Sequence, residues 1–256
     1  GGPTGTGKTE TAKVLGQILG TDREAMIRID CNTLQGVGSE ATSAAWRLLG
    51  VPQGYVGYAR GQGGLLSRIR DTPECIVLFD EFEKANAAVG EVLLQIMDDG
   101  KAEDVDGNLL DFRRSYLIFT SNAGCSYEKP KNFGFSTVQT GMQISITAES
   151  LRQDLLRRGL GEEFLARIQH TFLFTCLGKP ALEKIIHKQL LELKEKTEKR
   201  GLVLIWQEPL VGHLLSRWQP QLGVRFLSLI LRNRVNEQLA LADAQGELQG
   251  ITQIVL

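Results

Sequence analysis

The segment GPTGTGKT at residues 2–9 fits the pattern G-x-x-x-x-G-K-[ST] and decides the fold predicted for this chain of 256 residues. The glycines of such a loop let successive backbone N–H groups point at phosphate oxygens, and the lysine reaches the terminal phosphates. A helix predicted to begin near Lys8 adds the partial positive charge of its N-terminal end. An ordinary glycine-rich turn is the alternative. The nucleotide-binding residues predicted on this basis are Gly2, Pro3, Thr4, Gly5, Thr6, Gly7, Lys8 and Thr9.

Two carboxylates, Asp80 and Glu81, follow the apolar segment CIVLF at residues 75–79. An uninterrupted apolar run of this length is typical of a buried strand in a parallel sheet, and ligands of open α/β sheets bind at the carboxyl ends of the strands. We therefore expect Thr9 and Asp80 to hold Mg²⁺, with Asp80 acting through a water molecule, and Glu81 to orient the attacking water. A surface turn with acidic residues is the alternative.

A third polar side chain, Asn122, ends the strand predicted over LIFTS at residues 117–121. Taken alone, it would more often be a turn residue at the end of a strand. Beside the phosphate loop and the two carboxylates, its amide is instead predicted to contact the γ-phosphate or the attacking water.

Helical and strand patterns alternate over the first two thirds of the chain, which predicts an α/β fold with a parallel sheet flanked by helices. Residues 170–177, HTFLFTCL, are expected to form the last strand of this sheet, and residues 125–142 a long loop. Beyond residue 180 the pattern changes to a long charged helix, a strand, two further helices and a final strand. We therefore expect a large subdomain at residues 1–177 and a smaller α/β lid at residues 178–256, with nucleotide between them.

The composition limits the classes of function. A formal net charge of -1 gives no attraction of the whole molecule to nucleic acid, and no apolar run approaches the roughly 18–20 residues that span a membrane. The four cysteines and three histidines are scattered without the spacing of zinc ligands. Reduced, mostly buried cysteines are typical of a cytoplasmic protein.

Taken together, these motifs resemble those of the AAA+ P-loop ATPases of the Clp type, specifically the second, C-terminal ATPase module of the Clp unfoldases and disaggregases. The family's order and approximate spacing are kept by GPTGTGKTE, GVPQGYVGY, VLFDEFEKAN, LLQIMDDG, VDGNLLDFR and TSNAG. The resemblance implies ATP and Mg²⁺ as ligands and a homo-oligomeric, hexameric ring. It makes Lys8 and Thr9 Walker A residues, Asp80 and Glu81 Walker B residues, and Asn122 sensor 1. It also implies a buried strand before the phosphate loop, so we expect an N-terminally truncated sequence whose first strand is missing.

Two arginines match further motifs of this family. The segment EEFLARIQ resembles the one that bears the arginine finger, so Arg167 is expected to reach the ATP of a neighbouring subunit; an ordinary surface salt bridge is the alternative. Ala166 stands where the family usually has asparagine. The segment LGVRFL resembles the sensor 2 motif, with Arg225 at the γ-phosphate and Val224 in place of the usual alanine.

The glycine-rich segment at residues 50–64, GVPQGYVGYARGQGG, resembles the pore loop of the family. Tyr55 and Val56 are therefore the residues expected to grip a polypeptide, because a broad amphipathic ring can contact many kinds of side chain. Tyr58 is expected to brace the loop or the adjacent subunit. A turn whose tyrosines pack against the domain is the alternative.

These features predict an ATP-dependent protein unfoldase or translocase that threads unfolded or tagged polypeptide through a central pore. Phe133, Gly134 and Phe135 lie where protease-coupled relatives carry a docking tip for the ClpP peptidase, although both phenylalanines could instead pack on the domain. A disaggregase without a protease partner is the alternative function. A motor on nucleic acid is less favoured, because Arg60 is the only cation near the loop tip, and an idle nucleotide switch is disfavoured by the complete set of catalytic residues.

Overall fold

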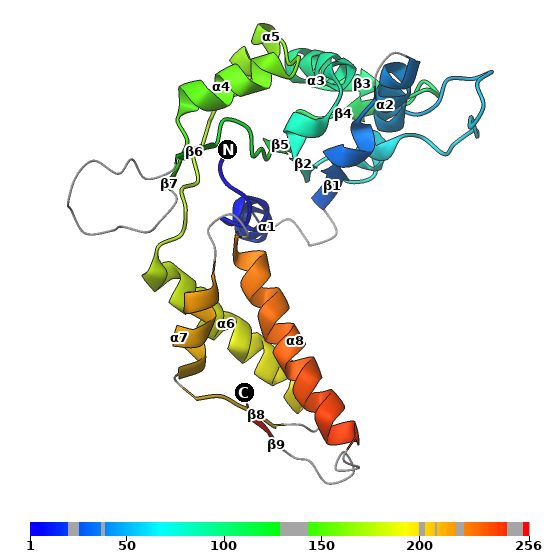
Figure 1. The fold of residues 1–256 in the computed structure, drawn as a ribbon. Coiled ribbons are helices and arrows are strands. Elements are labelled where there is room, and N and C mark those ends of the chain that lie inside the picture. The colour runs from blue at the N-terminus through cyan, green and yellow to red at the C-terminus, as the bar shows by residue number, and fades with distance from the viewer. Residues whose placement is uncertain are drawn as a thin grey trace, which may run out of the picture. The chain divides into compact units, whose positions relative to one another are not determined.

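The computed structural model describes residues 1–19, 26–36, 39–128, 143–199, 203–207, 209–218, 223–244 and 253–255. The chain divides into two compact units. The first comprises Gly1–Gly2 and Gly7–Phe174, and the second comprises Pro3–Thr6 and Thr175–Leu256. Figure 1 shows their helices and strands. Among the described residues, no helix is long and apolar enough to cross a membrane.

A parallel sheet of three strands forms the centre of the first unit, in the order β1–β2–β5. The strands are β1 (Met26–Asp30), β2 (Ile76–Asp80) and β5 (Tyr116–Phe119). Every residue of β2 is buried, as its apolar sequence predicts for a strand between two neighbours. The register pairs Asp30 with Asp80 and Phe79 with Phe119, so the ends of the strands lie level at one edge of the sheet.

Helices cover both faces of this sheet, because alternate residues of a strand point to opposite sides. On one face, Ile76 and Leu78 pack against Ala12 of α1 (Lys8–Ile18). On the other face, Val77 and Phe79 belong to the main hydrophobic core. That core includes residues of α2 (Ser39–Leu49), α3 (Ala87–Asp99), α4 (Ala148–Arg157), α5 (Glu162–Ala166) and the short 3-10 segments η2 (Cys31–Leu34), η3 (Leu65–Arg70) and η4 (Phe82–Lys84). The predicted α/β fold with a flanked parallel sheet is confirmed.

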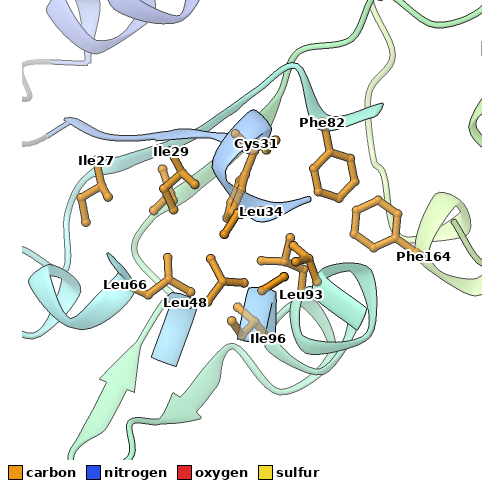
Figure 2. Close-up of a cluster of buried hydrophobic side chains, with 14 of the residues drawn as sticks. Ile27, Ile29, Cys31, Leu34, Leu48, Leu66, Phe82, Leu93, Ile96 and Phe164 are labelled. Atoms are coloured by element: carbon orange, nitrogen blue, oxygen red, sulfur yellow. The ribbon is translucent and has the colours of Figure 1, made fainter. Parts of the chain in front are cut away.

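Figure 2 shows this core, in which ten labelled side chains from strands, helices and 3-10 segments converge. Four phenylalanine rings form one part of it. Phe82 of η4 stacks on Phe164 of α5 with ring centroids 5.1 Å apart, and both rings contact Phe119 of β5. Phe79 of β2 stacks on Phe119 at 5.2 Å. The rings of Phe82 and Phe119 thus connect the strand that ends in Asp80 with the short helix that precedes Arg167.

Two antiparallel hairpins extend from the first unit. The first pairs β3 (Lys101–Glu103) with β4 (Leu109–Asp111), where the sequence segment DGNLLDF indicates a hairpin. The second pairs β6 (Ser126–Glu128) with β7 (Gln143–Ser145). The prediction of one long loop over residues 125–142 is wrong at its start, because β6 lies within it. Residues 129–142 lie outside the described part of the chain.

The prediction of a strand over residues 170–177 is wrong, and none of these residues lies in a strand. Phe172 accepts a hydrogen bond from Gly1 N, and Phe174 N donates one to Gly1 O, each 2.8 Å long. These two backbone hydrogen bonds join the segment to Gly1 without forming a strand ladder. The side chain of Phe172 is 72% exposed.

The second unit is built from α6 (Lys179–Glu198), β8 (Val203–Ile205), α7 (Pro209–Arg217), α8 (Gly223–Ala244) and β9 (Gln253–Val255). Its core is formed by Leu182, Ile186 and Leu190, which follow the four-residue spacing of one face of α6, together with Val211, Leu214, Leu227 and Leu231. The strands β8 and β9 pair in parallel. The predicted smaller C-terminal domain with a terminal strand is thus present.

Candidate nucleotide site

The phosphate loop is built on glycine conformations that other residues rarely adopt. Gly7 caps the N-terminus of α1 with φ 98°, in the left-handed region. The segment Pro3–Thr6 belongs to the second unit, where it lies against the first residue of α8. A Cβ atom on Gly223 would come within 2.6 Å of Thr4 O and 2.8 Å of Gly5 Cα, so glycine is required for this close approach.

Lys8 projects from the first position of α1 toward the end of β5. Its ammonium donates hydrogen bonds to Gly2 O at 2.6 Å and to Asn122 Oδ1 at 2.7 Å. Burial lowers the pKa of Lys8 below its ordinary value, and negative charge at Cys125, Glu83, Asp80 and Glu81 partly opposes this. The structure therefore brings the predicted Walker A lysine and the predicted sensor 1 amide into direct contact.

Asp80 is almost fully buried and accepts three side-chain hydrogen bonds. Its Oδ1 atom accepts from Thr120 Oγ1 at 2.6 Å and from Thr9 Oγ1 at 3.0 Å, while Oδ2 accepts from Arg28 at 2.5 Å. Burial favours the neutral acid, but the hydrogen bonds from Thr120, Arg28 and Thr9 outweigh it, so the pKa of Asp80 lies below its ordinary value. The carboxylate is thus held ionised beside the Thr9 hydroxyl.

Glu81 lies immediately beyond β2 in a left-handed conformation, with φ 59° and ψ 48°. Its backbone N–H donates to Thr120 Oγ1 at 3.1 Å, and its carboxylate Oε2 accepts a hydrogen bond of 2.8 Å from Asn32 Nδ2. Asn32 is itself fixed, because the same amide nitrogen donates to Asp30 Oδ1 at 2.8 Å. The carboxylate predicted to orient water is therefore positioned by a neighbouring strand end.

Glu83 joins the Walker B segment to the end of β5. It is buried, and its Oε1 atom accepts a hydrogen bond of 3.1 Å from the backbone N–H of Asn122. Its Oε2 atom is buried and has no hydrogen-bond partner within the described part of the chain. A buried carboxylate oxygen in this state adds negative potential next to Lys8.

Four residues of this site were not predicted from the sequence, namely Arg28, Asn32, Glu83 and Thr120. Arg28 lies in β1, and Asn32 lies just after it. Both residues lie close to the end of β2 because the two strands pair in parallel, with Asp30 beside Asp80. Thr120 lies two residues before Asn122, within the apolar segment that predicts the strand, and its hydroxyl is a local signal for a polar contact there. Contact of Thr120 with Asp80 depends on the pairing of β2 with β5.

The donor set fits magnesium, which prefers oxygen ligands and usually binds through one or two carboxylates together with substrate phosphates. The hydroxyl of Thr9 and the carboxylate of Asp80 supply such oxygens, and they lie 3.0 Å apart. The low pKa of Asp80 keeps its carboxylate in the charged form that a divalent cation requires.

The two predicted arginines lie in different units. Arg167 caps the C-terminal end of α5 and forms an ion pair with Asp98 of α3. The hydrogen bond to Asp98, together with the negative charge of that carboxylate, raises the pKa of Arg167. Arg225 is an exposed residue in the first turn of α8, two positions after Gly223, which lies against the phosphate-loop segment Pro3–Thr6.

The predicted pore-loop residues are exposed. The side chain of Tyr55 is 56% exposed and that of Val56 is fully exposed. Gly54 and Gly57, on either side of them, have φ values of 93° and 98°, which turn the backbone sharply at the tip. Phe133, Gly134 and Phe135, predicted to dock a peptidase, lie outside the described residues.

Comparison with known proteins identifies the class. Residues 1–171 match the family described as AAA domain (Cdc48 subfamily), and the chain belongs to this family, which implies a nucleotide-binding domain. Residues 177–256 match the C-terminal, D2-small domain, of ClpB protein. The chain thus fits the C-terminal AAA+ module of the Clp type, as its sequence motifs predicted.

Individual relatives agree with this assignment. The chain is 36% identical over 247 residues to chaperone protein ClpB 1 of Synechococcus elongatus, and 32% identical over 255 residues to chaperone protein ClpB of Oceanobacillus iheyensis. These matches cover 96% and 99% of this chain but only 27% and 31% of the relatives. A closed-state cryo-electron microscopy reconstruction of Hsp104 with ATPγS and FITC-casein shares 29% identity and superimposes with a TM-score of 0.75, over 98% of this chain and 41% of that chain.

Proposed function

We propose that this chain is the ATP-hydrolysing module of a cytoplasmic protein unfoldase or disaggregase, which assembles into a hexameric ring and threads polypeptide through a central pore. The observation that carries the proposal is the convergence of functional groups at one edge of the sheet. Lys8 lies 2.7 Å from Asn122, Thr9 lies 3.0 Å from Asp80, and Asn32 holds the carboxylate of Glu81 at 2.8 Å.

Each side chain has a defined task in hydrolysis. Lys8 donates hydrogen bonds to phosphate oxygens, which are strong acceptors because they are charged. Glu81, oriented by Asn32, accepts a hydrogen bond from the attacking water. Thr9 and Asp80 would hold Mg²⁺, which would neutralise negative charge at the phosphates.

Arginine completes the site in two ways. Arg167 of one subunit stabilises the charge that develops on the ATP of its neighbour, an effect of about 10³–10⁵ in rate for finger arginines. Arg225 serves as the second cation near the γ-phosphate. Because Arg167 acts in trans, hydrolysis requires the assembled ring.

The exposed tip of the pore loop favours polypeptide over nucleic acid as the substrate. Tyr55 and Val56 present a ring and an aliphatic side chain, which suit apolar segments of unfolded chains. The relatives matched by the chain are ClpB chaperones and Hsp104, which favours a disaggregase that works without a peptidase. A ClpP-docking role for Phe133, Gly134 and Phe135 stays a prediction, for which degradation of a folded substrate in the presence of ClpP is the assay.

Tyr55→Ala in the full-length protein tests this proposal. We expect ATP hydrolysis to stay near its original rate and unfolding of a folded, tagged substrate to be lost. Tyr116→Ala is the matched control, because Tyr116 is 51% exposed against 56% for Tyr55 but lies on β5 rather than on the loop. Unfolding that survives Tyr55→Ala at its original rate would contradict the pore-loop assignment.

A further inference from the structure

Trp46 lies on the side of α2 opposite to the helix residues that are buried in the main hydrophobic core. Its neighbours Ala44 and Leu48 are buried in that core. At about 100° per residue, a side chain two positions away lies roughly 200° around the helix, so Trp46 faces the opposite side. Trp46 is not one of the described residues that form this core or pack against it. A tryptophan in such a position requires another partner.

That partner is Tyr55. The two ring centroids lie 4.6 Å apart with an interplanar angle of 58°, a tilted arrangement within the range of favourable aromatic pairs. Trp46 also lines a pocket of about 630 Å³, so part of its side chain borders open space. The ring of Tyr55 therefore rests on a second ring that is fixed to a helix, while more than half of its own surface is exposed.

The other side of the loop is fixed to the hairpin of β3 and β4. Asp106, in the turn of this hairpin, accepts hydrogen bonds from Tyr58 Oη at 3.1 Å and from Gly61 N at 2.8 Å. Partial desolvation and the hydrogen bond from Tyr58 Oη to Asp106 raise the pKa of Tyr58 above its ordinary value. The loop is thus held at Tyr55 by Trp46 and at Tyr58 and Gly61 by Asp106.

We propose that Trp46 is a positioning residue for Tyr55, and that the aromatic pair Trp46–Tyr55 forms a two-ring surface for aliphatic and aromatic side chains of an unfolded polypeptide. This inference rests on the proposed function. A single tyrosine on a glycine-rich loop would lose side-chain and backbone freedom whenever it bound substrate. Contact with Trp46 restricts that freedom in advance, so more of the contact energy is available for binding.

The test compares Trp46→Ala with Trp46→Phe in the full-length, assembled protein. We expect Trp46→Ala to raise the KM for a folded, tagged substrate about 2- to 10-fold, the range that follows from the contribution of one aromatic pair. Trp46→Phe should restore most of this loss, because it retains a ring. Basal ATP hydrolysis should be unchanged in both. If neither variant changes the KM, or if both lose unfolding and ATP hydrolysis alike, the inference is wrong.

Fluorescence gives a second measurement that a merely structural role would not alter. The difference between the emission spectra of the parent protein and Trp46→Phe isolates the signal of Trp46. We expect saturating casein, an unfolded polypeptide, to change this signal; an unchanged difference spectrum would refute the proposed contact surface. Loss of unfolding in Tyr55→Ala with an unaffected Trp46→Ala would leave the proposed function intact and remove this inference alone.

Discussion

The ammonium of Lys8 lies 2.7 Å from the amide oxygen of Asn122, although 114 residues separate the two in sequence. This contact joins the start of α1 to the end of β5, so the lysine is already aimed at the side chain that is proposed to contact the γ-phosphate. Two elements that are far apart in the sequence thus supply neighbouring side chains of the proposed phosphate site.

Lys8→Ala should weaken ATP binding about 10- to 100-fold, since hydrogen bonds to charged groups contribute about 1.5–3 kcal/mol. Titration with a fluorescent ATP analogue measures this. Lys13→Ala is the control on the same helix, because Lys13 is exposed and pairs with Glu10. Equal loss of affinity in both variants would mean that Lys8 has no specific role.

Glu81→Gln should retain ATP binding and lower hydrolysis about 10²- to 10⁴-fold, the usual effect of losing a general base. Asn32→Ala should lower hydrolysis less, because it removes the hydrogen bond that orients Glu81 but leaves the carboxylate. Phosphate release and nucleotide affinity, measured together, separate the two effects. An Asn32→Ala variant with unchanged hydrolysis would show that this hydrogen bond is dispensable.

Arg167→Ala and Glu81→Gln should complement each other in mixed rings. A site that takes Glu81 from one subunit and Arg167 from the next is intact wherever an Arg167→Ala subunit precedes a Glu81→Gln subunit. Random mixing in equal amounts makes about one quarter of the sites intact in a cyclic assembly. ATP hydrolysis should therefore reappear on mixing two inactive variants. A mixture as inactive as its components would argue against action in trans.

Arg28→Met should lower the stability of the domain at neutral pH and weaken the dependence of that stability on acidic pH. Because the folded-state pKa of Asp80 lies below the unfolded value of about 3.9, ionised Asp80 stabilises the fold above about pH 4, and this stabilisation is lost as the pH falls through the folded-state pKa. Loss of Arg28 raises that pKa toward the unfolded value, so the stabilisation becomes smaller. Thermal unfolding between pH 3.5 and 7 measures the change, with the exposed Arg60→Met as the control. Parallel curves for both variants would contradict the role of Arg28.

Phe164→Ala should lower the free energy of unfolding by about 3–5 kcal/mol, and Phe164→Leu by less than about 1.5 kcal/mol, because only the first leaves a large cavity among the phenylalanine rings. Phe172→Ala is a control of the same chemistry, since Phe172 is 72% exposed whereas Phe164 is 3% exposed. Denaturant unfolding is the measurement. Similar losses for Phe164→Ala and Phe172→Ala would mean that the ring cluster contributes no special stability.

The parts of the site that the sequence predicted are those whose signal is local. Lys8 and Thr9 lie in one short motif, and Asp80 and Glu81 follow one apolar run, so each pair could be found without knowing how the strands are arranged. Arg28 and Asn32 act on Asp80 and Glu81 only because β1 and β2 pair in parallel and in one register. Sequence pattern alone does not specify that register.

The parts of the fold that were predicted wrongly or missed also depend on contacts between segments that are distant in the sequence. Apolar residues at 170–177 fit a strand, but a strand also needs a ladder of backbone hydrogen bonds with a partner, which a local apolar pattern does not specify. The contact of Trp46 with Tyr55 depends on how a glycine-rich loop folds back on a helix, and no short-range pattern encodes this.

The backbone of Glu81 has a further consequence for how this domain can change over time. Among the described residues it is the one non-glycine residue with a positive φ, a conformation that costs an L-residue about 1–2 kcal/mol. Glycine would relieve that cost, yet it would remove the carboxylate. Selection for a more stable protein and selection for a working ATPase therefore act in opposite directions at this position. The glutamate found there is the residue that favours ATPase activity over stability.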